Sequence, residues 1–236
     1  MADILGAPES EDDLYLARAD EVEPYRPALQ GDVFRDVTIP GVETEHEYAM
    51  VIMHPCSMRR GPALLPRIQM IPVASYQNLP FDQWPLGHSR VFPLPNLLAG
   101  GKNFAASFLE TGMVASAELQ PDRRVATLTE NGVMLLQQRY VHYLTRVVMQ
   151  MSRLRQVSEH ILVEAELQED WCADLVPPRT AGGETLATAL EAESKQFHDF
   201  ITHGAGDTLQ EMLQDPVRQS DVRRRVRQEV ARRRTS

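Results

Sequence analysis

A short segment near residue 54 concentrates the side chains best suited to chemistry. The run HPCSMRRG places His54, Cys56, Arg59 and Arg60 within seven residues. A cysteine acts as a nucleophile when its thiol pKa is low and a base lies nearby, and His54 is the candidate base. Two ligands are too few for a zinc site, which needs three or four. Three interpretations stay open: a reactive thiol, part of a metal site, or a structural cysteine buried at the end of a strand.

Arginines outside this run offer phosphate-binding chemistry. Arg67, together with Arg59 and Arg60, could hold a phosphate, because a guanidinium presents a planar fork of donors. The alternative for these residues is a solvated turn. Farther along, Arg139 and Arg146 share one face of a predicted helix with a histidine between them. That face could meet RNA, a protein partner or solvent.

The last twenty residues carry a basic, helix-like pattern. In VRRRVRQEVARRR, valines recur every four residues and arginines fill the other positions. The arginines Arg223, Arg224 and Arg225 could bind nucleic acid by neutralising phosphates. They could equally pair with acidic segments of the same or a neighbouring chain, or stay solvated. No aromatic residue interleaves, so base stacking is not indicated.

Residues 28–128 predict the sheet that would position the first group of side chains. Short apolar stretches with turn residues between them indicate a small β-barrel or a twisted antiparallel sheet. Strands are expected at 28–40, 48–54, 67–76 and 88–94, then twice within 104–118 and once at 122–129. The run at 48–54 is apolar throughout, which is typical of a strand buried on both faces. Pro72 indicates an edge or a bulge in its strand.

Residues 129–236 predict helices, so the fold class is α+β. Apolar residues recur every three or four positions from Val133 to Leu162, and Thr129 can cap the start. A continuous helix of over forty residues is unusually long, so a break or a partner helix is expected. Pro177 and Pro178 are expected to end it. Two more helices are predicted at 184–203 and 207–232, with a boundary near Pro216.

Charge is distributed unevenly along the chain. The net charge is -9. Residues 1–25 hold eight acids and one arginine, whereas residues 217–236 hold eight arginines and two acids. Residues 1–27 are therefore expected to be largely disordered, with Leu14, Tyr15 and Leu16 docking locally.

Hydropathy and cysteine usage point to a cytoplasmic protein. No stretch reaches the roughly 18 apolar residues of a membrane span, and the acidic start is unlike a signal peptide. The chain has only two cysteines, far apart in sequence. A reducing compartment fits that usage better than a disulfide framework does.

Three segments of the first half resemble the MazF/PemK-like family. GDVFRDVTIPG, YAMVIMHPCSM and IQMIPVASY follow its pattern of Gly-Asp, a strand ending near Pro-x-x-Gly, an apolar strand, and a later strand with a Pro-(Ile/Val)-x-Ser core. The resemblance covers residues 29–148 and implies a small SH3-like barrel. Active members cleave single-stranded RNA in a groove, often as dimers.

The resemblance also implies catalytic positions, and one of them differs here. Members use an arginine, usually in an Arg-Pro pair opening the second strand, and a Thr or Ser on the later strand. Ser75 matches that hydroxyl. Glu47-Tyr48 stands at the Arg-Pro position, and a carboxylate there would repel the phosphate that the arginine stabilises.

The sequence therefore favours a non-catalytic MazF/PemK-like binding or interaction module, linked to toxin–antitoxin or phage-defence systems, with a protein partner or a second copy of itself. An RNA endonuclease is the alternative, in which Ser75 acts with a displaced arginine (Arg59, Arg60 or Arg67) and Cys56 is a further candidate. A nucleic-acid-binding regulator that uses the arginine tail is the third possibility. No metal and no cofactor are expected.

Overall fold

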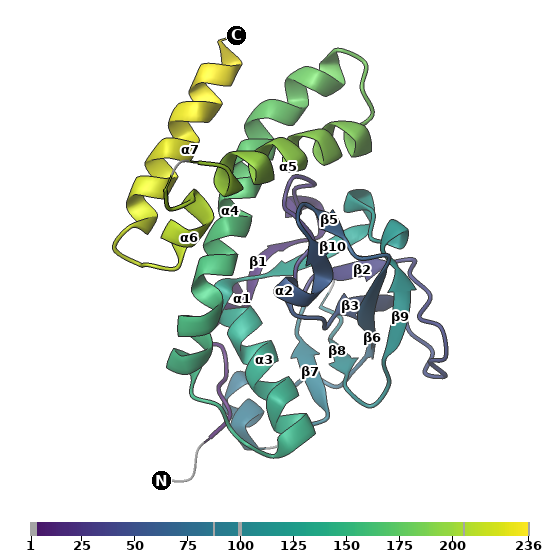
Figure 1. Ribbon diagram of the computed structural model, residues 1–236. Coiled ribbons are helices and arrows are strands. Elements are labelled where there is room, and N and C mark those ends of the chain that lie inside the picture. Colours follow the sequence, from purple (N-terminus) through teal and green to yellow (C-terminus); the bar gives the residue numbers. More distant parts are fainter. Residues whose placement is uncertain (1–3, 87, 99–100, 205, 236) are drawn as a thin grey trace. The chain divides into compact units, whose positions relative to one another are not determined.

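The computed structural model describes residues 4–86, 88–98, 101–204 and 206–235, which form two compact units (Figure 1). The first unit holds the described residues up to Pro24 together with Ala28–Met58 and Leu64–Val157. The second unit holds Tyr25–Pro27, Arg59–Ala63 and the chain from Ser158 onward. None of the described helices is both long enough and apolar enough to cross a membrane.

The first unit is built on an eight-stranded sheet in which every described pairing is antiparallel. The strands follow the order β1 (Tyr15–Arg18), β10 (Arg124–Leu128), β2 (Val33–Arg35), β3 (Tyr48–Val51), β6 (Arg67–Ser75), β8 (Phe104–Ser107) and β7 (Val91–Leu94), and β9 (Gly112–Ala115) also pairs with β6. The sheet curls into a half-barrel, and no described pairing joins its end strands β1 and β7. The α+β prediction is confirmed, in its twisted-sheet form.

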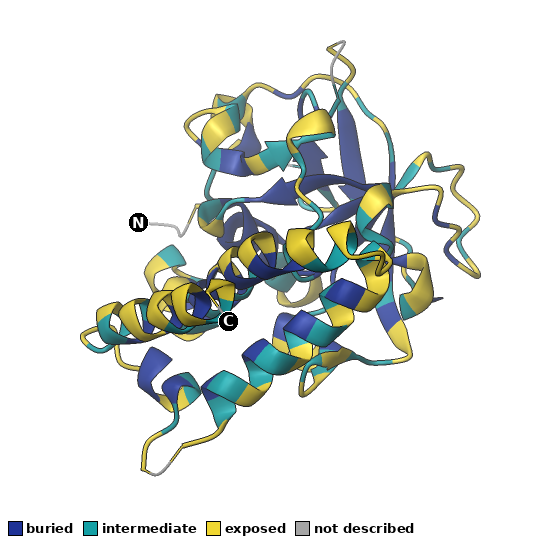
Figure 2. Ribbon diagram, turned by 90° about the horizontal axis from the view of Figure 1, so that it is seen from above, coloured by how far each residue is buried: buried dark blue, intermediate teal, exposed yellow. Residues whose placement is uncertain are grey.

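Both faces of the sheet are buried. Because successive side chains of a strand point to opposite faces, neighbouring residues belong to different apolar clusters. In β3, Met50 belongs to one apolar cluster, whereas Ala49 and Val51 belong to another. In β2, Val33 and Phe34 divide between the same two clusters. Figure 2 shows the strands largely in the colour of buried residues. The apolar run at 48–54 is thus explained by a strand covered on both sides.

Pro72 lies in an interior strand, not at an edge. It pairs in register with Ala49 of β3. On the other side of β6, β9 covers Arg67–Met70 and β8 covers Val73–Ser75, so the neighbouring chain is interrupted opposite Ile71 and Pro72. Proline has no N–H to donate to a neighbouring strand, and it is tolerated here because no neighbouring residue needs that hydrogen bond.

The N-terminal segment is more ordered than its composition suggested. Glu11–Leu14 forms α1, a single helical turn capped by Ser10, and β1 follows it directly. Leu14 and Tyr15 are buried, as expected, whereas Leu16 is exposed. This acidic segment is ordered because β1 pairs with β10, and the hydrogen bonds of the sheet satisfy its backbone groups.

The long helical pattern breaks into two helices, as predicted. Helix α3 (Glu130–Thr145) begins at Thr129, whose side chain accepts a hydrogen bond from the Gly132 N–H at 2.9 Å. It ends at Arg146 in the left-handed conformation, and α4 (Met151–Ala181) follows. The expectation that Pro177 and Pro178 end the helix is wrong, because α4 continues past both to Ala181.

The second unit is a helical cluster. Helices α5 (Leu186–Thr202), α6 (Leu209–Leu213) and α7 (Gln219–Arg234) pack with the later part of α4 (Figure 1). Its core includes Trp171 from α4, Phe197 from α5 and Leu213 from α6. The valines spaced by four on α7, Val222, Val226 and Val230, are buried in the same core.

Candidate functional site

The HPCS run does not form a buried nucleophile or a metal site. Cys56 is exposed on the four-residue helix α2 (Pro55–Met58), so the expectation of a buried cysteine at a strand end is wrong. Its backbone N–H donates to Nδ1 of His54 at 3.3 Å. Within the described residues, no three His, Cys, Asp or Glu side chains gather in a way that could hold a metal ion.

Arg59 and Arg60 belong to a different compact unit from the other proposed catalytic residues. They form strand β4 (Arg59–Arg60), which pairs with β5 (Ala63–Leu64) in a small hairpin. Arg59 donates from Nη1 to the Pro62 carbonyl at 3.2 Å, and Arg60 is exposed. The hairpin residues up to Ala63 group with the second unit, whereas Cys56 and Ser75 lie in the first.

Arg67 and Ser75 stand at opposite ends of one strand. They are the first and last residues of the nine-residue β6, and both are exposed. A strand rises about 3.3 Å per residue, so their Cα atoms lie roughly 26 Å apart. A hydroxyl and an arginine that act on the same phosphate must both lie within hydrogen-bonding reach of it. These two residues therefore cannot form one catalytic pair within a single chain.

The loop between β2 and β3 is acidic where the resemblance places an arginine. Residues 35–38 and 42–48 line a hollow of about 690 Å³, and its charged side chains include Asp36, Glu43, Glu45 and Glu47 against a single arginine, Arg35. Glu47 directly precedes β3. The local electrostatic field is thus unfavourable for a phosphate group.

This acidic loop is fixed by a further carboxylate, Glu110. The Glu43 N–H donates to Glu110 Oε1 at 3.0 Å, and the Thr44 N–H donates to Oε2 at 3.3 Å. The Thr44 hydroxyl also donates to Oε2. These hydrogen bonds, that of the Thr44 hydroxyl first, lower the pKa of the Glu110 carboxyl. The loop therefore carries its negative charge in a defined conformation.

Arg139 cannot bind nucleic acid as predicted, because its side chain is completely buried. Its Nη2 donates to the Trp84 carbonyl at 2.7 Å, and its guanidinium lies 5.0 Å from the centroid of the Trp84 indole. Burial lowers the pKa of this arginine to about 10. The sequence held a signal for this burial, since Arg139 follows Leu135 and Leu136 by four and three residues and so shares the core face of α3.

Arg146 is the accessible member of the predicted face. It is exposed, and its Nη1 lies 3.4 Å from the Ser89 hydroxyl. His142, one turn earlier, has its pKa lowered by burial and then by the positive charges of Arg146 and Arg139. The shared face predicted for these residues exists, but only its end reaches solvent.

The arginines of α7 are largely engaged inside the second unit. Arg223 makes a two-pronged contact with Glu166 on α4, at 2.6 and 2.8 Å, and Arg224 pairs with Asp221 at 2.7 Å. Arg225 is exposed and forms no ion pair with another described residue. Of the three interpretations of the tail, pairing with an acidic group of the same chain applies to Arg223.

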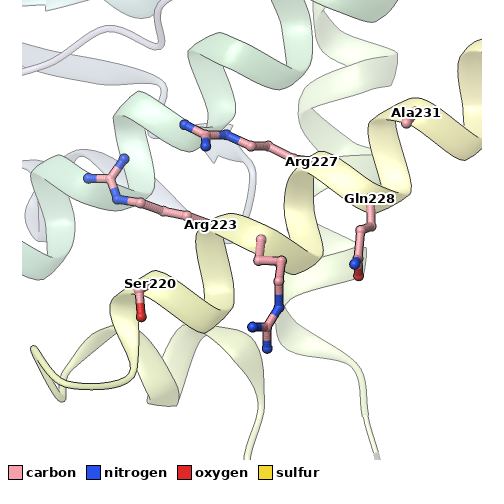
Figure 3. A pocket seen from close by; sticks show the side chains of 6 residues that line it. Ser220, Arg223, Arg227, Gln228 and Ala231 are labelled. Atoms are coloured by element: carbon pink, nitrogen blue, oxygen red, sulfur yellow. The ribbon is translucent and has the colours of Figure 1, made fainter.

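The exposed side of α7 forms a shallow groove of about 440 Å³ (Figure 3). Its lining residues all come from this helix: Ser220, Arg223, Arg224, Arg227, Gln228 and Ala231. In Figure 3, Arg223 and Arg227 project to the same side of the helix. Glu166 neutralises the first of them, which weakens the case for a phosphate-binding surface here.

Sequence reasoning missed the segment that covers Arg139. Residues 4–8, which we call the N-terminal strap, run over α3, and Leu5 and Pro8 are buried. The Gly6 N–H donates to Oε1 of Gln138 at 2.6 Å, and the Gly6 carbonyl accepts from Nη2 of Arg139 at 3.4 Å. The residues ILGAP have little pattern of their own, so only their contacts identify them.

Comparison with known proteins adds no assignment to this geometry, because no family model matches the chain and no curated protein matches it either.

Proposed function

We propose that this protein is a non-catalytic binding or interaction module with a MazF/PemK-like sheet. The observation that carries the proposal is the acidic loop between β2 and β3. Glu47 occupies the position at which an active member of that family would need an arginine, and Asp36, Glu43 and Glu45 line the same hollow. Four carboxylates beside one arginine repel an RNA backbone instead of stabilising a phosphorane.

The positions of the other candidate residues support the same proposal. Ser75 and Arg67 are separated by the length of β6, and Arg59 and Arg60 group with the other compact unit. Arg139 is enclosed in the protein. Ser75 and Arg67 lie too far apart along β6 to supply a nucleophile and a cation to the same phosphate, which is the minimum that such chemistry requires.

The partner that we propose is another protein or a second copy of this chain, in a toxin–antitoxin or phage-defence setting within the cytoplasm. Both cysteines are free thiols, which a reducing compartment accommodates. The edge strands β1 and β7 offer backbone groups to a partner strand. Neither feature involves nucleic acid.

The test is incubation of the purified full chain with end-labelled single-stranded RNA, beside Ser75→Ala, Arg59→Ala and Arg60→Ala. We expect intact RNA in every reaction. The proposal fails if the unaltered chain cuts RNA and any of these substitutions abolishes the cutting, because the endonuclease alternative would then hold.

The regulator alternative needs its own measurement. Val222, Val226 and Val230 are buried, so deleting the tail would damage the second core. Arg224→Gln with Arg225→Gln removes two exposed charges instead. We expect DNA and RNA binding, compared at 50 and about 200 mM salt, to be weak and unchanged by the double substitution. Salt-dependent binding that this substitution removes would favour the regulator.

A further inference from the structure

The N-terminal strap is held against α3 in the manner of a bound peptide. Its Gly6 donates one backbone hydrogen bond to Gln138 and accepts one from Arg139. Its Leu5 side chain is buried, whereas Ile4 is exposed. Backbone hydrogen bonds joined to a buried apolar anchor are the usual way in which a protein recognises an extended peptide.

The position of Gly6 leaves little room for a side chain. A Cβ built there would lie 2.8 Å from Leu135 Cδ2 and 3.2 Å from Gln138 Oε1, with Met151 Sδ at 3.7 Å. The first two separations are closer than packed side chains normally allow. The neighbouring side chains, Leu135 and Gln138, therefore favour glycine at this point of the peptide.

The strap accepts from only one of the hydrogen-bond donors of Arg139. Its Nε and Nη1 are buried and find no hydrogen-bond partner among the described residues. It also forms no ion pair with a described carboxylate, and the Gly6 carbonyl accepts at the long distance of 3.4 Å. Leaving a buried cation with unused donors is unfavourable, so this site is built for a stronger acceptor than one peptide carbonyl.

We infer that the strap is an internal stand-in for an external ligand, a short apolar peptide that ends in glycine with a free carboxylate. A terminal carboxylate would replace the Gly6 carbonyl and offer Arg139 two charged oxygens, which form stronger hydrogen bonds than a neutral carbonyl. The same peptide could keep the hydrogen bond to Gln138 and the burial of the Leu5 side chain. This inference rests on the proposed interaction function and names the chemistry of its partner.

The strap itself supplies matched probes. Acetyl-Ile-Leu-Gly with a free carboxylate repeats residues 4–6, and its C-terminal amide differs only in charge. We expect Gly6→Val in the full chain to displace the strap through the clash at Leu135 and Leu5→Ala to loosen it without adding bulk. Ile4→Ala, at an exposed position, serves as the control.

The two tryptophans report on the binding. Trp84 lies beneath the Arg139 guanidinium, whereas Trp171 lies in the second unit, so the indole N–H signals in a two-dimensional NMR spectrum provide a reporter and an internal reference. We expect the acid to shift the Trp84 signal of Gly6→Val and to bind about tenfold more tightly than the amide. Trp171 should not shift. The unaltered chain and Ile4→Ala should bind the acid more weakly, because the strap competes.

Arg139→Gln in the Gly6→Val background should remove the preference for the acid. Equal binding of acid and amide, or a preference that survives Arg139→Gln, overturns the inference. If Gly6→Val does not fold, Leu5→Ala carries the same titration and the same criteria.

Failure here is distinguishable from failure of the proposed function. A chain that leaves RNA intact but shows no preference for the acid remains an interaction module with a different site. A chain that cuts RNA through Ser75 loses the interaction assignment whatever the peptides do.

Discussion

At the scale of single residues, Glu193 is a buried carboxylate that joins two helices of the second unit. It is buried in α5, and its carboxylate accepts hydrogen bonds from the Trp171 indole N–H at 3.0 Å and from Arg179 Nη1 at 2.8 Å. The Arg233 guanidinium lies 4.7 Å from the centroid of the Trp171 ring. One carboxylate thus connects α4 and α5.

Removing that carboxylate should be costly. Glu193→Ala would leave the indole N–H of Trp171 buried without an acceptor, and we expect a loss of about 2–3 kcal/mol in the free energy of unfolding. Urea denaturation followed by circular dichroism measures it. Glu191→Ala, exposed on the same helix, is the control and should change stability by less than about 0.5 kcal/mol. Equal losses for the two variants would contradict this account.

At the scale of elements, α3 begins against the backbone of α1. A Cβ at Gly132 would lie 2.4 Å from the Leu14 carbonyl oxygen. That carbonyl accepts a hydrogen bond from the Thr129 N–H at 3.0 Å, so it is held where it is. Glycine is therefore required in the first turn of this helix.

Gly132→Ala tests this requirement, because two effects oppose each other. Alanine favours a helix over glycine by about 1 kcal/mol. The clash with a fixed backbone atom costs roughly 1–3 kcal/mol. We expect the clash to prevail and the melting temperature to fall. Gly204→Ala, where a Cβ meets nothing within 4 Å, should leave the melting temperature unchanged. A more stable Gly132→Ala variant would show that the two segments move apart freely.

The elements themselves were largely predictable, because their signals are local. The strands at Tyr48–Val51 and Arg67–Ser75 follow from apolar runs, and the start of α3 follows from Thr129. The double proline was misread because its effect on the helix depends on the surroundings. Pro177 and Pro178 cannot donate to the carbonyls of Ala173 and Asp174, but those residues are exposed, so water can hydrogen-bond to the carbonyls. Val176, just before the prolines, is buried in the core and holds this part of α4 in place.

The candidate site was less predictable than the fold, since side-chain environment depends on distant parts of the chain. The strand predicted at 67–76 already places Arg67 and Ser75 at its two ends, whereas only the structure shows that Arg59 and Arg60 group with the second unit. Arg139 looked like a surface cation, although its spacing from Leu135 and Leu136 already indicated a core face. The acidic character of the loop before β3 was readable directly, because Glu47 is part of the sequence pattern.

At the scale of the whole molecule, a short early segment contributes to the late helical core. Arg26 pairs with Glu169 of α4 at 2.7 Å, and the Arg26 side chain is only 9% exposed. Tyr25 packs against the same core. The second unit is therefore assembled from residues that are well over a hundred positions apart.

A double-mutant cycle measures this connection. Glu169→Gln and Arg26→Ala should each lower the free energy of unfolding, and their combined effect should be smaller than the sum by about 1–2 kcal/mol. Glu159→Gln, on the same helix, should add to Arg26→Ala without interaction. Additivity of the Arg26 and Glu169 changes would mean that the pair contributes nothing.

The alternation of the two units along the chain also constrains the order in which its parts can fold. The chain changes unit five times, and the second unit takes in Tyr25–Pro27 and Arg59–Ala63 long before its own helices are synthesised. On the ribosome the sheet can close once Val157 has emerged, but those two early segments must wait for partners made later, such as Glu169 of α4 for Arg26. If translation pauses or stops before those helices are made, the sheet is folded while the two early segments remain without their helical partners. Chaperones and proteases recognise partly folded chains of this kind.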